Sequence, residues 1–212
     1  MKTLRTAVAF AALMTAGVVA AQPRTDLPTV EAVLGRFDAA VGGDAALQRQ
    51  QVRHYRGTIV QDLTWTDPQH AETPFLAEAD ADGRVRYAET AAWPELPDTN
   101  ATSLTARLRW LLHPRFALRV ADVFPALSVS GRETRGGRPM VVLAPRDLKY
   151  GQSALFFDEE TGLLSHIGYH DDLADWREVD GVLFPHRYVF GRKGGHTTYV
   201  FTELAAGPAP RP

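Results

Sequence analysis

The feature that most constrains this chain is a succession of short extended runs joined by tight, glycine-containing turns after Gln51. Asp82-Gly83, Gly136-Gly137 and Asp180-Gly181 each stand between two such runs, which is the signal of a β-hairpin. Consecutive hairpins imply that neighbouring strands pair antiparallel. The pattern predicts about ten strands, at residues 52–65, 75–80, 84–90, 127–134, 139–143, 153–158, 163–169, 176–179, 182–190 and 196–204.

Two apolar segments with helical spacing complete the predicted fold. Residues 28–41 place apolar side chains every three or four positions and are followed by Gly42-Gly43. Residues 103–124 have the same spacing, but His113-Pro114 divides them because proline disfavours helical geometry in the residue before it. About ten antiparallel strands must twist and curl into a barrel or part-barrel, whose concave face needs filling. We therefore expect an α+β fold with the helices packed on the concave face.

The first residues have the features of an export signal. Lys2 and Arg5 precede a run of 15 uncharged residues that ends at Ala21, where small side chains favour cleavage. Residues 1–21 are thus a predicted bacterial signal peptide, and an uncleaved membrane anchor is the alternative. The remainder is expected to form one domain, residues 22–204, in the periplasm. The Pro- and Ala-rich tail, residues 205–212, is expected to be disordered.

Composition excludes several functional classes. The chain has no cysteine, so it forms no disulfide, thiolate zinc site or cysteine nucleophile. A formal net charge of -2, which falls to about -4 without Lys2 and Arg5, does not fit a nucleic-acid binder. The densest histidine cluster contains His166 and His170, which lie ~13 Å apart on an extended strand, too far to share an ion. We therefore predict no catalytic site, metal or cofactor.

Three stretches carry a resemblance to a known family. They are residues 37–47 (FDAAVGGDAAL), 157–164 (FDEETGLL) and 175–186 (DWREVDGVLFPH). Over residues 28–204 the chain resembles the outer-membrane lipoprotein-sorting-like proteins, the superfamily of LolA-type and LolB-type carriers and RseB-type sensors. The resemblance implies an unclosed β-barrel with helices as a lid, which holds an acyl chain or another apolar ligand. Turn chemistry alone also explains these motifs, because Gly162 and Asp180-Gly181 suit tight returns.

The predicted function is a non-catalytic periplasmic binding or carrier protein for a lipid-like or acylated ligand. An acyl chain or lipoprotein and an envelope protein are the expected partners, and the expected state is a monomer. The alternatives are an envelope sensor or interaction module whose barrel is filled by its own side chains, and an unrecognised hydrolase. The candidates for lining a hydrophobic cavity are large apolar residues: Trp65, Phe75, Trp93, Trp110, Leu112, Phe116, Phe124, Phe156 and Tyr188.

Overall fold

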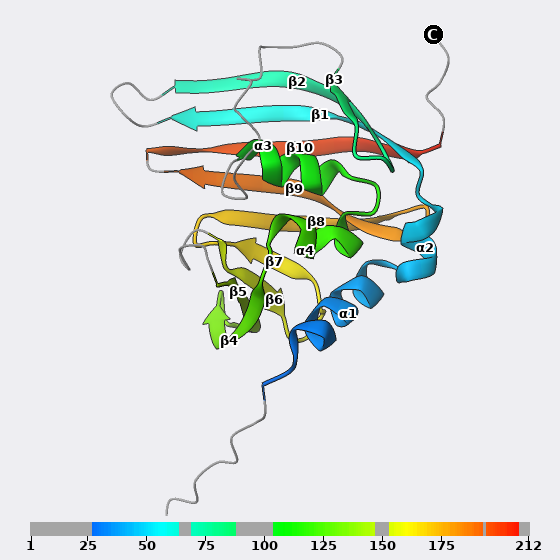
Figure 1. Cartoon of the computed structure of the whole chain (residues 1–212). Helices are drawn as coiled ribbons and strands as arrows, with labels where there is room; N and C mark the ends of the chain where they lie inside the picture. Colours follow the sequence, from blue (N-terminus) through cyan, green and yellow to red (C-terminus); the bar gives the residue numbers. More distant parts are fainter. Residues whose placement is uncertain (1–26, 64–68, 88–103, 147–152, 193, 208–212) are drawn as a thin grey trace, which may run out of the picture.

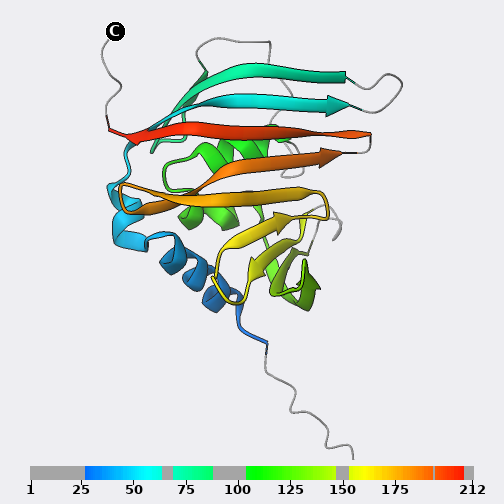
Figure 2. The same cartoon turned by 180° about the vertical axis from the view of Figure 1, so that it is seen from behind.

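The computed structural model describes residues 27–63, 69–87, 104–146, 153–192 and 194–207. Within them all strands join in one antiparallel sheet, and the helices lie together on one of its faces (Figures 1 and 2). The helices are α1 (Val30–Val41), α2 (Asp44–Arg49), α3 (Leu104–Leu112), the 3₁₀ helix η1 (Phe116–Arg119) and α4 (Val120–Val123). The strands are β1 (Val52–Leu63), β2 (Gln69–Asp80), β3 (Val85–Tyr87), β4 (Leu127–Arg135), β5 (Arg138–Pro145), β6 (Leu155–Asp158), β7 (Leu164–Ile167), β8 (Asp171–Val179), β9 (Val182–Arg192) and β10 (Gly195–Ala206).

The strand order explains why helices cover one face of the sheet. The order is β3-β2-β1-β10-β9-β8-β7-β6-β5-β4, so β3 and β4 follow each other in the chain but lie at opposite ends of the sheet. Neighbouring strands are ~4.8 Å apart, so the link between them spans roughly 43 Å if the sheet is flat. The described part of this link, residues 104–124, crosses one face (Figure 1). We call it the crossing segment.

The predicted α+β class and the strongly curved, unclosed antiparallel sheet are confirmed. Several strands extend beyond the predicted runs, since β2 begins at Gln69 and β8 begins at Asp171. In β8 the reason is Asp175, whose φ of 56° interrupts the regular alternation of side chains on which the prediction rested. The predicted signal peptide, residues 1–21, and residues 208–212 of the predicted tail lie outside the described residues.

Helix α1 has clear sequence signals at both ends. Thr29 is its N-cap and accepts a hydrogen bond from the Ala32 backbone N–H at 3.2 Å. Gly42 ends the helix with a φ of 131°, and a Cβ there would lie 2.3 Å from the Gly181 carbonyl oxygen. The C-terminus of α1 therefore contacts the β8–β9 turn at a distance that only glycine allows.

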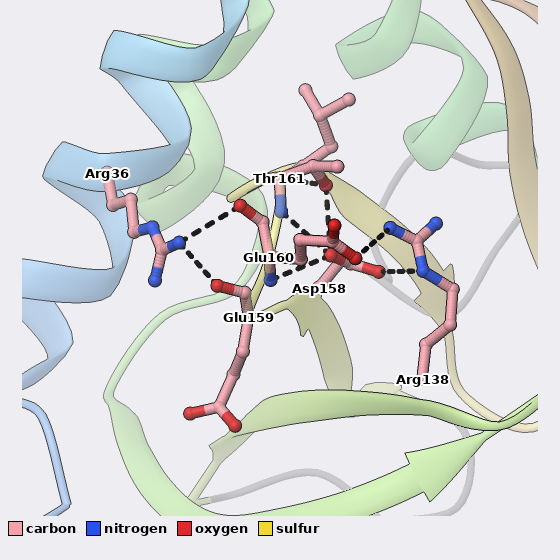
Figure 3. A network of polar contacts seen from close by, with 7 residues as sticks. Arg36, Arg138, Asp158, Glu159, Glu160 and Thr161 are labelled. Carbon is pink, nitrogen blue, oxygen red and sulfur yellow. Dashed lines mark hydrogen bonds and ion pairs between the residues drawn. The ribbon is translucent and has the colours of Figure 1, made fainter.

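The turn between β6 and β7 binds the Arg36 side chain of α1 (Figure 3). Asp158 Oδ1 accepts hydrogen bonds from the backbone N–H groups of Glu160 and Thr161 at 2.9 and 2.8 Å, and Asp158 Oδ2 pairs with Arg138 Nε at 2.8 Å. Arg36 of α1 donates to the backbone carbonyls of Glu159 and Glu160. The FDEETGLL motif thus builds a turn that binds α1.

The ladder between β9 and β10 ends part-way along both strands. Their pairing runs from Gly195–Arg192 to Val200–Arg187 and stops before Pro185. Proline has no N–H to donate to a neighbouring strand, so it interrupts a ladder. Beyond this point β10 pairs with β1 as far as Ala206. Side chains of β1, of β9 and of Gln50, which follows α2, meet where the two strands separate.

Candidate functional site

A continuous layer of aromatic rings fills the space between the sheet and the helices. Phe116 of η1 packs edge-on against Phe37 of α1 at 6.1 Å and against Phe184 of β9 at 5.6 Å between ring centroids. From Phe184 the contacts continue to rings on β1, β2 and β10. We call this set the aromatic layer: Phe37, Tyr55, Phe75, Phe116, Trp176, Phe184, Tyr188, Tyr199 and Phe201.

The structure brings together six of the nine candidates from the sequence. All six are buried in the main core cluster, four of them on the crossing segment and two on the sheet: Trp110, Leu112, Phe116, Phe124, Phe75 and Tyr188. Phe156 is also buried, but it belongs to a second cluster with Met140, Val142 and Ala154. Trp65 and Trp93 lie outside the described residues.

Sequence reasoning missed several members of the aromatic layer. Phe184 lies four residues before Tyr188 on β9, and Tyr199 lies two residues before Phe201 on β10. Each pair therefore shares one face of its strand. Phe37 lies on the apolar face of α1. The alternation along these strands indicates which residues share a face, but it does not tell which face lies under the helices.

Polar contacts around this apolar layer join the crossing segment to the sheet. Arg107 of α3 forms a buried ion pair with Asp171 of β8, which also accepts a hydrogen bond from the Tyr188 hydroxyl at 3.1 Å. Burial raises the pKa of Asp171, although Arg107 opposes that shift. At the other end of α3, the Tyr55 hydroxyl donates to the Leu112 carbonyl at 2.5 Å. Both attachments lie on the face of α3 that contacts the sheet.

The bend in the crossing segment is at His113-Pro114, as the proline predicts. The side chain of His113 is buried, and its Nδ1 accepts a hydrogen bond from the Arg115 backbone N–H at 3.0 Å. Arg119 Nη1 lies 2.9 Å from His113 Nε2. Burial, followed by the positive charge of Arg119, lowers the pKa of His113 to about 4. The imidazole is therefore neutral near pH 7.

In the histidine cluster weighed for metal binding, His166 lies beside one carboxylate. His166 Nδ1 lies 3.5 Å from Asp172 Oδ1 on the neighbouring strand. Within residues 27–63, 69–87, 104–146, 153–192 and 194–207, no group of three or more His, Asp or Glu side chains has a geometry that could hold a metal ion. In the same residues, no helix is long and apolar enough to cross a bilayer.

Comparison with solved structures finds similar folds at low sequence identity. A DUF1329 family protein from Desulfovibrio piger ATCC 29098 superposes with a TM-score of 0.52 at 11% identity, over 86% of this chain and 95% of that chain. A LolA superfamily protein from Nitrosomonas europaea superposes with a TM-score of 0.50 at 13% identity, over 87% and 96% of the two chains. The chain has a LolA-like fold. No family model and no curated protein matches its sequence.

Proposed function

We propose that this protein is a non-catalytic periplasmic binding or carrier protein for a lipid-like or acylated ligand. The observation that carries the proposal is a crossing segment that is bent at His113-Pro114, covers the aromatic layer and is joined to the sheet by a buried ion pair and a tyrosine hydroxyl. In this function the crossing segment is a lid, and the acyl chain takes the place of lid side chains against the sheet. The LolA-like fold supports this arrangement.

The apolar surface is sufficient to bind such a ligand. Each methylene buried contributes ~0.8 kcal/mol, so a dozen methylenes contribute roughly 10 kcal/mol before association costs of several kcal/mol. The rings that leave contact with the crossing segment regain contact with the ligand. The free energy needed to open the segment is therefore offset within the same apolar layer.

One observation favours a second function, an envelope sensor or interaction module. Phe37, Phe116 and Phe184 are fully buried against one another, so the protein's own side chains occupy the space between helices and sheet. In this alternative the crossing segment stays closed, and the module acts through its outer surface on another envelope protein. The two functions predict different contents of the purified protein.

The test is to export the full chain in a bacterium, purify it from the periplasm and extract it with organic solvent. The carrier function predicts a co-purified lipid by mass spectrometry and saturable binding of a fluorescent fatty acid by the stripped protein. Intact mass of the same sample should correspond to a chain that begins at Gln22, which checks the signal peptide. A lipid-free protein that also fails to bind the fatty acid would leave the interaction module as the function.

A further inference from the structure

A charged side chain lies inside the core without a countercharge. Arg53 of β1 is 0% exposed and shares its face of the strand with Tyr55, so the guanidinium lies on the same side as the helices. None of the ion pairs among the described residues includes Arg53. A buried charge is normally paired, because its loss of hydration is otherwise uncompensated.

The hydrogen bonds of Arg53 are also incomplete. Nη2 donates to the Gln50 side-chain oxygen at 3.3 Å, and the guanidinium carbon lies 5.2 Å from the centroid of the Phe184 ring. Nε and Nη1 are buried and have no hydrogen-bond partner. Arginine has five N–H donors, of which Nε and Nη1 carry three. The Tyr55 hydroxyl interacts with this guanidinium, and the donors that remain unsatisfied are available for a further oxygen acceptor.

The position of Arg53 places these donors at the edge of the aromatic layer. Across the sheet Arg53 faces Ala79 on β2 and Ala206 on β10, whose side chains are small. It lies where β9 and β10 separate beyond Val200–Arg187. Tyr55, two residues further on β1, contacts the bend of the crossing segment through the Leu112 carbonyl. The guanidinium is therefore near the point where the lid would open.

Groups of both signs lie around this position, several arginines and the carboxylates of Asp80 and Asp175. Arg115 of the crossing segment donates from Nε to the Gln50 carbonyl at 3.1 Å. The pKa of His186 is lowered, chiefly by burial and also by Arg177 and Arg53, while Asp175 opposes the shift. The pKa of His113 is lowered by burial, Arg119 and Arg115, while Asp80 opposes the shift. The arginines at this end of the aromatic layer attract a negative group, and Asp80 and Asp175 oppose it.

We propose that Arg53 binds the headgroup of the ligand, and that the ligand is an amphiphile with a carboxylate at the end of its acyl chain. One uncompensated guanidinium is balanced by one negative charge, and carboxylate oxygens accept from its free N–H groups. The acyl chain then extends from Arg53 along the aromatic layer under the crossing segment. This inference rests on the proposed function and adds the chemical class of the ligand.

The test compares ligands that share a chain and differ only at the head. Hexadecanoic acid, hexadecan-1-ol and hexadecyl phosphate are titrated into the exported, lipid-stripped protein. The variants are Arg53→Met and, as matched control, Arg56→Met, which removes the same charge from the exposed face of the same strand.

We expect the acid to bind at least about tenfold more tightly than the alcohol, as charge-assisted hydrogen bonds imply. Arg53→Met should abolish this preference and leave affinity for the alcohol unchanged, whereas Arg56→Met should leave both unchanged.

A thermal midpoint separates a binding role from a structural one. Without ligand, Arg53→Met should melt at or above the temperature of the unsubstituted protein, because it removes an uncompensated buried charge. Hexadecanoic acid should then raise the midpoint of the unsubstituted protein more than that of the variant. If Arg53→Met does not fold, Arg53→Gln, which is also uncharged, takes its place in the same comparison.

Each remaining outcome has a definite meaning. Equal affinity for acid and alcohol would overturn the role of Arg53 and leave the carrier function standing. Tighter binding of hexadecyl phosphate than of the acid would overturn the carboxylate assignment. Failure of all three ligands to bind would overturn the carrier function itself. A lower thermal midpoint in Arg53→Met with an unchanged preference for the acid would show that Arg53 is structural.

Discussion

Helix α1 and the crossing segment cover the same face of the sheet, but they are built differently. α1 is one uninterrupted helix with a threonine N-cap and a glycine C-cap, and Arg36 binds it to backbone carbonyls of the β6–β7 turn (Figure 3). The crossing segment is broken at His113-Pro114 into an α-helix, a 3₁₀ helix and a single α-helical turn. Its main polar attachments are a buried ion pair and one tyrosine hydroxyl.

This difference suggests a division of roles. Both segments bury aromatic side chains against the sheet, so apolar packing alone does not tell a fixed helix from a lid. The attachments differ, because the C-terminus of α1 is in close backbone contact with the β8–β9 turn at Gly42, whereas the crossing segment is bent and is joined to the sheet through side chains such as Arg107 and Tyr55. If the roles differ in this way, changes in the crossing segment should alter ligand binding and changes near α1 should not.

The largest effect is expected from Phe116→Asp. It removes a fully buried ring from the aromatic layer and places an unpaired carboxylate there. This should weaken the packing of the crossing segment on the sheet by at least about 5 kcal/mol. We expect ligand binding to be lost while far-ultraviolet circular dichroism retains the strand signal. Unchanged binding with a collapsed thermal midpoint would refute the lid.

Phe156→Asp is the matched control for that variant. Phe156 is equally buried, but it lies in the second cluster, where the Arg135 guanidinium carbon is 3.9 Å from its ring centroid and can pair with a new carboxylate. It should lower the thermal midpoint and leave ligand affinity within about twofold, as expected for a site the ligand does not touch. A loss of binding here would mean that any core damage abolishes binding.

The ion pair between α3 and β8 gives the next effect. Arg107→Met leaves the Asp171 carboxylate buried without its cation, which should cost about 3–5 kcal/mol. The double variant Arg107→Met/Asp171→Asn should recover most of that loss in urea unfolding. If the single and double variants are equally destabilised, the pair does not hold the crossing segment to the sheet.

His113 predicts a pH dependence of stability. Its pKa in the folded protein is about 4, below the ordinary value of 6.5, so the unfolded chain binds the proton more tightly. Stability should therefore fall as the pH drops from 6.5 and the loss should be complete below about 4, with a total of roughly 3 kcal/mol. The raised pKa of Asp171 acts in the opposite sense, so the measurement is the difference between the protein and His113→Asn. A difference that does not vary between pH 7 and pH 4 would contradict the buried, neutral imidazole.

The smallest effect is expected at α1. Arg36→Met removes the hydrogen bonds that this exposed side chain donates to the backbone carbonyls of Glu159 and Glu160. The free energy of unfolding should fall by about 1 kcal/mol. Ligand affinity should stay unchanged, because α1 does not move in this account. A loss of affinity as large as that of Phe116→Asp would show that both helices move together.

Local sequence patterns predicted the hairpins and the helices, but they did not predict which distant strands pair. Glycine turns such as Asp180-Gly181 fixed the hairpins, and positive φ values at both residues agree with that reading. Nothing local indicated that β1 pairs with β10, which places the start and end of the domain side by side. Phe156 is a large apolar residue like the other cavity candidates, but it lies in the second cluster. Because β6 is buried on both faces, its alternation carries no information about which face lies under the helices.

Arg53 shows the opposite case, in which a readable signal was overlooked. It stands among polar residues, Arg53, His54 and Arg56, and this run looks solvent-exposed. At a period of two, however, Arg53 shares a face with Tyr55, Gly57 and Ile59. A charge in register with apolar positions indicates a buried charge, and only the structure shows that it lacks a partner.

Hydrogen exchange of the exported protein, measured by mass spectrometry with and without hexadecanoic acid, follows the opening of the crossing segment. We expect backbone amides of residues 104–124 to exchange faster than those of α1 in the free protein, because the crossing segment opens without global unfolding. The ligand should slow exchange in residues 104–124 and leave α1 unchanged. Equal exchange in the two segments, with no effect of the ligand on residues 104–124, would contradict the account.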